Sequence, residues 1–226
     1  MSKAAEVWNA VRPARRSACA RKSTDLIALA WALLAYLLAA AAPAGERAIV
    51  VVGDSLSAAY GLRAEQGWVH LLDRRVRAAG HAYQVVNASI SGDTSRGGSA
   101  RIGILLKRFE VAVAVVELGG NDGLRGIQLA NTRRHLAEMI AAFKAAGAKV
   151  LLVGMQIPPN LGPRYTRDFK AMYPALATEY DVALVPFLLE GVATDPALMQ
   201  RDGIHPTAAA QPLILENVWP HLKPML

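Results

Sequence analysis

The sequence predicts a single three-layer α/β/α domain built on a five-stranded parallel sheet. Five short apolar runs alternate with amphipathic stretches after Gly45, and no internal repeat or linker divides them. The third run, residues 111–118, is apolar on both faces, as central strands of parallel sheets are. Repeated alternation of strand and helix favours a parallel sheet, because each return connection places a helix over one face.

The elements follow one another in a regular order. The strands are apolar runs with many branched residues, bounded by Gly, Pro, Asn or Asp, and are expected at 48–52, 83–88, 111–118, 149–155 and 183–185. Between them, apolar residues recur at helical spacing. The helices are expected from Trp68 to Gly80, from the end of the turn-rich segment 89–95 to about Leu106, from Leu129 to Gly147, from about Thr166 to Tyr180, and after Thr207.

Residues 1–44 are expected to form a secretory signal peptide. Six Lys and Arg residues precede Thr24, no charge occurs in the 17 residues from Leu26 to Ala42, and small residues surround Pro43. A basic segment, an apolar segment and small residues at the cleavage site are typical of such a leader, with cleavage after Ala44. The alternative is an uncleaved membrane anchor, since roughly 17–25 apolar residues span a bilayer.

Removal of this leader changes what the composition implies. The formal net charge falls from +7 to +3, so the basic character is no argument for nucleic-acid binding. The only cysteine, Cys19, leaves as well, which excludes disulfides, thiol catalysis and cysteine-bound metals. We expect a periplasmic or secreted protein, or a membrane-anchored one if the leader is retained.

Candidate catalytic residues follow the predicted strands. Ser55, Gly92 and Asn121 come at or soon after the ends of three strands, and Asp202 and His205 lie in a later loop. The carboxyl ends of parallel strands share one edge, so these residues can converge there. They include a serine nucleophile, a histidine base, an aspartate to orient it, and two donors for an oxyanion.

Other chemistries lack their motifs. Ser55 is followed by Leu56 and Ser57 and not by X-Gly, so the nucleophile elbow of the α/β-hydrolases is absent. The glycine-rich stretch 92–98 lacks the Gly-Lys-Ser/Thr of a phosphate-binding loop. No His-Glu-X-X-His occurs and the carboxylates lack metal-ligand spacing, so no metal or cofactor is expected.

Four short blocks, GDSLS, SGDTS, GGND and DGIHP, resemble in order the four sequence blocks of the SGNH (GDSL-type) hydrolases. The resemblance extends from Ala48 to the end of the chain. The longer stretches VVNASISGDTS and VELGGNDGLRG are similar to the branch of bacterial periplasmic thioesterases, lysophospholipases and arylesterases. The resemblance implies a flavodoxin-like version of the predicted fold.

The resemblance also implies a role for each candidate. The family's nucleophile falls on Ser55, and its Asp-His pair falls on Asp202 and His205. Its oxyanion hole falls on the backbone N–H groups of Ser55 and Gly92 and on the side-chain amide of Asn121. The aspartates that flank these positions, Asp54, Asp93 and Asp122, are expected to accept hydrogen bonds that stabilise the loops.

The loops after the third and fourth strands are expected to border the acyl-binding groove, because they leave the same edge of the sheet. The residues expected to contact substrate there are Asp122, Gly123, Leu124, Ile157 and Pro158.

The resemblance implies a serine esterase that acts through an acyl-serine on aryl esters, acyl-CoA-type thioesters and lysophospholipids. One alternative is a deacetylase or acyltransferase of cell-envelope glycans, and another is a non-catalytic envelope binding protein. The absence of a carbohydrate-binding aromatic cluster weakens the first alternative, and the complete catalytic set weakens the second. We expect a monomer that binds a small acyl substrate, contacts membranes transiently and binds no nucleic acid.

Overall fold

The computed structural model describes residues 47–226. The predicted leader lies outside these residues, so its cleavage after Ala44 stays a prediction. Within residues 47–226, no helix has both the length and the apolar character needed to cross a membrane.

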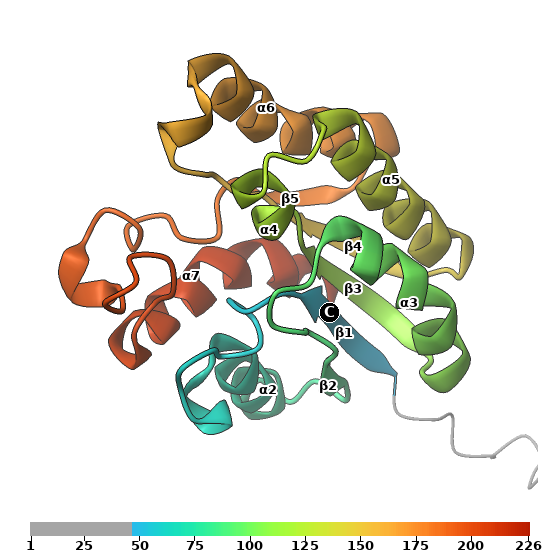
Figure 1. The fold of residues 1–226 in the computed structure, drawn as a ribbon. Coiled ribbons are helices and arrows are strands. Elements are labelled where there is room, and N and C mark those ends of the chain that lie inside the picture. Colours follow the sequence, from blue (N-terminus) through green and yellow to red (C-terminus); the bar gives the residue numbers. More distant parts are fainter. Residues whose placement is uncertain (1–46) are drawn as a thin grey trace, which may run out of the picture. The chain divides into compact units, whose positions relative to one another are not determined.

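Five parallel strands form one sheet in the order β2-β1-β3-β4-β5, which confirms the predicted fold class (Figure 1). β1 (Ala48–Gly53) lies between β2 (Gln84–Asn87) and β3 (Val111–Glu117). β4 (Lys149–Val153) and β5 (Ala183–Val185) extend the sheet beyond β3. Since the chain leaves β1 on one side and returns to pair on its other side, a crevice is expected at the carboxyl ends of β1 and β3.

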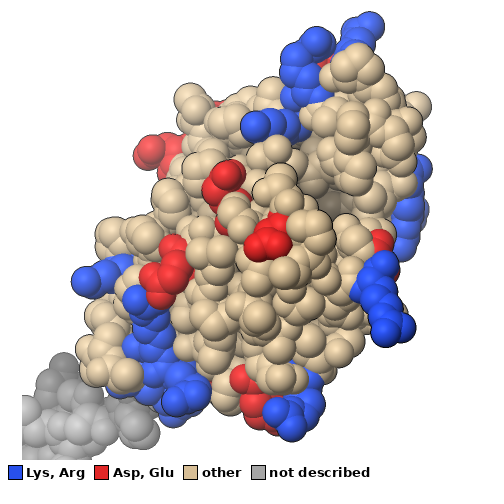
Figure 2. Space-filling model, turned by 90° about the vertical axis from the view of Figure 1, so that its left-hand side faces the viewer, with Lys and Arg blue, Asp and Glu red and all other residues tan. Residues whose placement is uncertain are grey.

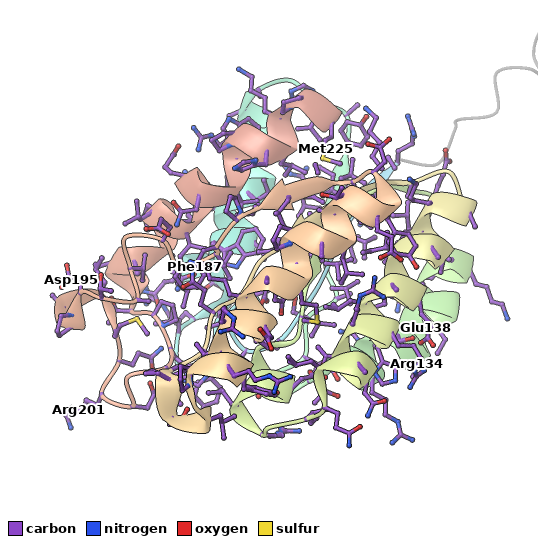
Figure 3. The ribbon with its side chains drawn as sticks, turned by 90° about the horizontal axis from the view of Figure 1, so that it is seen from above. Arg134, Glu138, Phe187, Asp195, Arg201 and Met225 are labelled. Carbon is purple, nitrogen blue, oxygen red and sulfur yellow. The ribbon has the colours of Figure 1, made fainter. Side chains whose placement is uncertain are left out.

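Helices cover both faces of the sheet. α3 (Ser95–Arg108), α5 (Leu129–Ala145) and α6 (Pro163–Tyr180) pack in that order over one face (Figure 1). α2 (Trp68–Ala78) and α7 (Gln211–Leu222) pack together over the other face. Seen from above, α5 and α6 run side by side, and the long connection after β5 lies away from Arg134 and Glu138 of α5 (Figure 3).

Complete burial explains why the central strands show no alternation of apolar and polar residues. All six residues of β1 and all seven of β3 are buried, because both faces of these strands lie under helices. Large side chains from both helical layers fill the space, among them Trp68 of α2, Phe143 of α5 and Tyr173 of α6. Glu117, the last residue of β3, is the one charged residue of these two strands and is also fully buried.

The structure contains a short helix that the sequence analysis did not predict. Residues 119–123 were expected to be a loop, but α4 (Gly120–Leu124) begins directly after β3. Gly119 makes this possible, because its φ of 111° is a left-handed conformation that favours glycine. A Cβ at Gly119 would also lie 2.3 Å from the hydroxyl oxygen of Tyr173. Asn121 is therefore held on a helical turn.

Two glycines provide a matched test of how tightly the ends of β4 and β5 pack. A Cβ on Gly154, just after β4, would lie 2.3 Å from the backbone oxygen of Pro186. A Cβ on Gly103, within α3, would meet nothing within 4 Å. We expect Gly154→Ala to lower the free energy of unfolding by about 1–3 kcal/mol, because backbone cannot move aside cheaply. Gly103→Ala should raise it by about 1 kcal/mol.

Urea unfolding of both variants and of the parent chain measures these differences. Equal stability of the two variants would contradict the packing described at Gly154.

Candidate active site

Ser55 lies in a tight turn directly after β1. Its Oγ is 2.9 Å from Nε2 of His205, a residue 150 positions later in the chain. Two backbone bonds shape the turn: Ala58 N–H donates to the Asp54 carbonyl at 2.9 Å, and Tyr60 N–H donates to the Ser55 carbonyl at 3.1 Å. The turn places the Ser55 hydroxyl at the carboxyl edge of the sheet, within reach of a base.

The imidazole of His205 is held by Asp202. Nδ1 of His205 is 2.7 Å from one oxygen of Asp202, and the other oxygen accepts the backbone N–H groups of His205 at 3.0 Å and Ile204 at 2.9 Å. These bonds, the backbone N–H of His205 first, lower the pKa of Asp202 to about 2. The carboxylate is therefore ionised at neutral pH, fixes the proton of His205 on Nδ1, and leaves Nε2 free to accept one from Ser55.

Tyr60 and Gln200 join the serine turn to the histidine loop. The Tyr60 ring lies against the His205 imidazole, with ring centroids 4.4 Å apart. The Gln200 amide donates to the carbonyl oxygens of Tyr60 and Pro206, both at 2.9 Å. Gln200 N–H also donates to the His205 carbonyl at 2.7 Å. The His205 imidazole is therefore positioned by its own loop and also by the turn that carries Ser55 and Tyr60.

The oxyanion candidates lie beside the serine turn. Nδ2 of Asn121 donates to a carboxylate oxygen of Asp54 at 3.0 Å and to the Asp93 carbonyl at 2.9 Å. Both amide hydrogens are engaged, so an oxyanion at Ser55 must share one of them. Gly92 has a φ of 79°, and its carbonyl accepts a hydrogen bond from Arg125 at 3.1 Å. Glycine adopts this conformation without strain.

A pair of buried carboxyl groups lies beneath the serine turn. One oxygen of Glu117 accepts the Ser57 hydroxyl at 2.6 Å and the Asp54 N–H at 3.3 Å. Among residues 47–226 the other oxygen, Oε1, has no hydrogen-bond partner. Burial, with the Asp54 charge second, raises the pKa of Glu117 well above its ordinary value. Burial also raises the pKa of Asp54, to about 6. The negative charge of this pair is therefore held more easily by Asp54 than by Glu117.

A cavity of about 550 Å³ opens beside Ser55 and His205. Its size lies within the range of small-molecule sites, roughly 300–1,000 Å³. Its apolar walls come from the connections after β3, β4 and β5, and include Leu124, Met155, Ile157, Pro158, Phe187 and Met199. An apolar chain attached to a carbonyl carbon at Ser55 therefore finds an apolar surface.

The structure brings only some of the expected substrate contacts to this cavity. Leu124, Ile157 and Pro158 line it, whereas Asp122 and Gly123 do not. This corrects the expectation for those two residues, because both belong to α4 and are buried in its packing against the rest of the protein.

The two residues left out of the cavity have structural partners. Asp122 accepts the Ser95 N–H at 2.8 Å and the Thr132 hydroxyl at 3.2 Å, and so joins the starts of α3 and α5 to α4. This is the loop-stabilising role that the sequence analysis also expected of Asp122. Gly123 permits close packing, since a Cβ there would lie 2.7 Å from Ile157 and 2.8 Å from Phe169.

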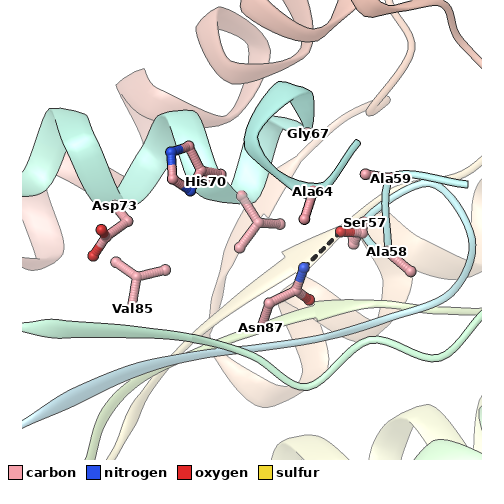
Figure 4. A pocket seen from close by; sticks show the side chains of 10 residues that line it. Ser57, Ala58, Ala59, Ala64, Gly67, His70, Asp73, Val85 and Asn87 are labelled. Atoms are coloured by element: carbon pink, nitrogen blue, oxygen red, sulfur yellow. Dashed lines mark hydrogen bonds between the residues drawn. The ribbon is translucent and has the colours of Figure 1, made fainter. Parts of the chain in front are cut away.

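A second, smaller cavity of about 220 Å³ lies on the other side of the serine turn (Figure 4). It is lined by Ser57 and Asn87 together with His70 and Asp73 of α2. The Asn87 amide donates to the Ser57 carbonyl at 2.8 Å. Neither Ser55 nor His205 lines this cavity, so it is separate from the cavity that opens beside them. Among residues 47–226, no group of three or more His, Asp or Glu residues is arranged to hold a metal ion.

Four features of the site were not predicted from the sequence. Glu117 carried a visible signal, a single acidic residue at the end of an otherwise apolar run. Tyr60, Gln200 and the cavity wall between Phe187 and Met199 carried none, because no periodicity or motif marks them.

Three comparisons place the chain among known proteins. Residues 51–212 match the GDSL-like Lipase/Acylhydrolase family. The chain is 56% identical to esterase TesA of Pseudomonas aeruginosa over 183 residues, 81% of this chain and 91% of that protein. It is 46% identical to thioesterase 1/protease 1/lysophospholipase L1 of Escherichia coli K12 over 178 residues, 79% of this chain and 84% of that protein. The crystal structure of TesA covers 80% of this chain and 100% of its own, at a TM-score of 0.78 and 57% identity.

The raised pKa of Glu117 has a measurable consequence for stability. A group whose pKa is raised in the folded state stabilises the fold below its ordinary pKa, and that contribution is lost as the pH rises through the folded value. We therefore expect the deficit in unfolding free energy of Glu117→Gln to shrink as the pH rises from 5 to 9. The glutamine keeps an acceptor for Ser57 but cannot ionise.

Urea unfolding at several pH values measures this deficit. Glu138→Gln is the control, because the pKa of the exposed Glu138 is lowered, by the Ser99 hydrogen bond first, and its effect should not change over this range. A constant deficit for Glu117→Gln across the range would refute the raised pKa of Glu117.

Proposed function

Because this chain belongs to the GDSL-like lipase and acylhydrolase family, we propose that Ser55 is the nucleophile of its esterase and thioesterase activity. The observation that carries the assignment is the hydrogen-bonded series from Ser55 Oγ to His205 at 2.9 Å and from His205 to Asp202 at 2.7 Å. This order of nucleophile, base and orienting carboxylate performs acyl transfer on several unrelated folds.

The geometry supports a two-step hydrolysis. Ser55 Oγ attacks the carbonyl carbon of the substrate while Nε2 of His205 takes its proton. The tetrahedral intermediate collapses, the alcohol or thiol leaves with the proton from His205, and an acyl-serine remains. Water then attacks this ester as His205 takes a proton from it, and collapse returns the proton to Ser55 and releases the acid. Asp202 stays ionised and stabilises the imidazolium in both steps.

Charge on the carbonyl oxygen is stabilised by the N–H groups of Ser55 and Gly92 and by the Asn121 amide. Asn121 is held in place by Asp54 and Asp93, at 3.0 and 2.9 Å, so its side chain needs no rotamer change, and one of its two amide hydrogens is shared with the oxyanion when it forms. Loss of one such donor typically costs about 2.7–4 kcal/mol of transition-state stabilisation.

The cavity supports acyl substrates with an apolar chain. Its walls carry aliphatic, methionine and phenylalanine side chains. Aryl esters, thioesters of the CoA type and lysophospholipids all present an acyl group of this kind. We assign lysophospholipids and other exported acyl esters as the natural substrates, since the expected leader takes the chain away from cytoplasmic acyl-CoA, and we assign a monomer as the working form.

Removal of the nucleophile provides the direct test. Ser55→Ala should lower kcat/KM for a p-nitrophenyl acyl ester by at least about 10⁴-fold, because no other group supplies the attacking oxygen. Ser99→Ala is a suitable control, since that hydroxyl bonds Glu138 on the surface at 2.9 Å. Hydrolysis that survives Ser55→Ala would remove the nucleophile assignment.

The export proposal has a separate test. N-terminal sequencing of the protein recovered outside the cytoplasm should give Gly45 as the first residue, because small residues precede the expected cleavage site. A chain that begins at Met1 and sediments with membranes would instead support the anchor.

A further inference from the structure

Apolar side chains are exposed around the mouth of the catalytic cavity. Of the seven large hydrophobic residues exposed within residues 47–226, five lie on connections at the carboxyl edge of the sheet. They are Tyr60, Ile90, Leu124, Leu161 and Ile204, each with 39–53% of its surface exposed. The connections that follow β1, β2, β3 and β4 each carry one of these residues, and the loop that carries His205 holds the fifth. We call these five residues the apolar rim.

Contacts between the connections show that the residues of the apolar rim lie on adjacent loops beside the cavity. Tyr60 lies against His205, and Leu124 and Ile204 line the cavity itself. Leu161 faces the connection after β3, because a Cβ on Gly126 would lie 3.7 Å from it.

Ile90 completes the rim from the connection after β2. Arg125, the neighbour of Leu124, donates to the carbonyl of Gly92, two residues from Ile90, at 3.1 Å. The apolar rim therefore belongs to adjacent loops and is not scattered over the molecule.

Arginines accompany the apolar rim. Six exposed arginines lie within six residues of a rim residue in sequence: Arg63, Arg96, Arg125, Arg164, Arg167 and Arg201. Arg164 and Arg167 both reach Asp168, at 3.7 and 3.0 Å, and within residues 47–226 the other four are without a carboxylate partner. Carboxylates on these loops bind other groups. Asp202 binds the His205 imidazole, and Asp195 accepts a hydrogen bond from the Ala197 N–H at 2.9 Å.

Figure 2 views the molecule from the side on which these loops lie in Figure 1. The centre of this face is mostly uncharged, with a few Asp and Glu side chains between, and Lys and Arg side chains gather toward its margins. A largely uncharged face with cationic margins suits a lipid surface, where acyl chains lie beneath a layer of phosphates, and the few Asp and Glu side chains near its centre take no part in binding phosphate.

We propose that the apolar rim and its arginines dock on the surface of a phospholipid bilayer and present the cavity mouth to acyl chains within it. The inference rests on the esterase function proposed above and adds where that esterase meets its substrate. Rim side chains enter the layer between headgroups and acyl chains, and the arginines bind lipid phosphates while their stems lie along the apolar surface.

The shape of the rim favours lipid over a protein partner or a second copy of this chain. Its members project singly from five separate loops with polar residues between them, and they form no continuous apolar face for a flat interface. A fluid surface adapts to separated projections. A docked mouth also spares an acyl chain from crossing water, which costs about 0.8 kcal/mol for each CH₂ group.

The test uses residues 45–226, because the expected leader is itself apolar and the described part of this segment contains the sheet, both helical layers and the core. The measurement is co-flotation with vesicles of phosphatidylcholine containing phosphatidylglycerol. The test variant is Ile90→Ser with Leu161→Ser, since neither residue lines the catalytic cavity. The control is Ile104→Ser on α3, which removes a more exposed apolar residue (67%) away from the rim.

We expect the rim variant to lose at least about tenfold in the vesicle-bound fraction relative to the free fraction, and the control to match the parent. Arg63→Gln with Arg96→Gln should bind vesicles more weakly than the parent, and this difference should grow as the phosphatidylglycerol content rises. Lys107→Gln on α3 should bind like the parent. Hydrolysis of a water-soluble p-nitrophenyl ester by the rim variant should equal that of the parent, which confirms its fold.

Two outcomes would overturn the proposal: a parent segment that does not float with vesicles, or equal binding by the rim and control variants. Either result leaves the esterase assignment intact, because that assignment depends on Ser55 and the soluble ester. Inactivity of the parent on the soluble ester would contradict the esterase assignment itself.

Discussion

The arrangement of the site depends on one buried carboxyl group. Glu117 ends β3, is fully buried, and accepts the Ser57 hydroxyl at 2.6 Å and the Asp54 N–H at 3.3 Å. A serine that follows a strand without the usual glycine elbow needs another support for its turn, and Glu117 supplies it from the neighbouring strand. Gly53 is required for this contact, since a Cβ there would lie 2.5 Å from the Glu117 carboxyl. Register between β1 and β3, which pairs Gly53 with Glu117, therefore decides where Ser55 points.

The second constraint is that the chain between β5 and α7 must bring His205 to the edge of the sheet where Ser55 lies. The Gln211 side chain at the start of α7 accepts the Trp68 N–H of α2 at 2.9 Å across 143 residues of sequence. Gln200 and Tyr60 add the bonds described at the histidine loop. The packing of α7 on α2 positions His205, and the pairing of β1 with β3 positions Ser55. Both therefore determine the 2.9 Å between Ser55 Oγ and His205 Nε2. The geometry of the proposed nucleophile and base is therefore a result of core packing, and a disturbance of either helical layer would change it.

The sequence predicted the parts of this protein that local signals encode. Branched apolar runs mark the five strands, and the blocks around Ser55, Asn121 and His205 mark the residues that the structure brings together. Asp122 and Gly123 were assigned to the groove because they follow a strand end, but proximity in sequence does not say which side of α4 a residue faces. The wall between Phe187 and Met199 was not predicted at all, because irregular segments have no period. Buried pairs such as Glu117 and Asp54 depend on strand register, which a single sequence does not contain.

Two aspartates show how environment separates roles in one site. Asp202 lies near the surface with three hydrogen bonds, and its pKa falls to about 2. Asp54 is buried, and its pKa rises to about 6 despite bonds from Leu56 and Asn121. Asp202 therefore stays ionised down to about pH 2, whereas Asp54 gains a proton below about pH 6. Protonation of Asp54 weakens its hold on the Asn121 amide, so acid conditions act on the donor that we propose for the oxyanion. The two aspartates of one site therefore respond to different ranges of pH.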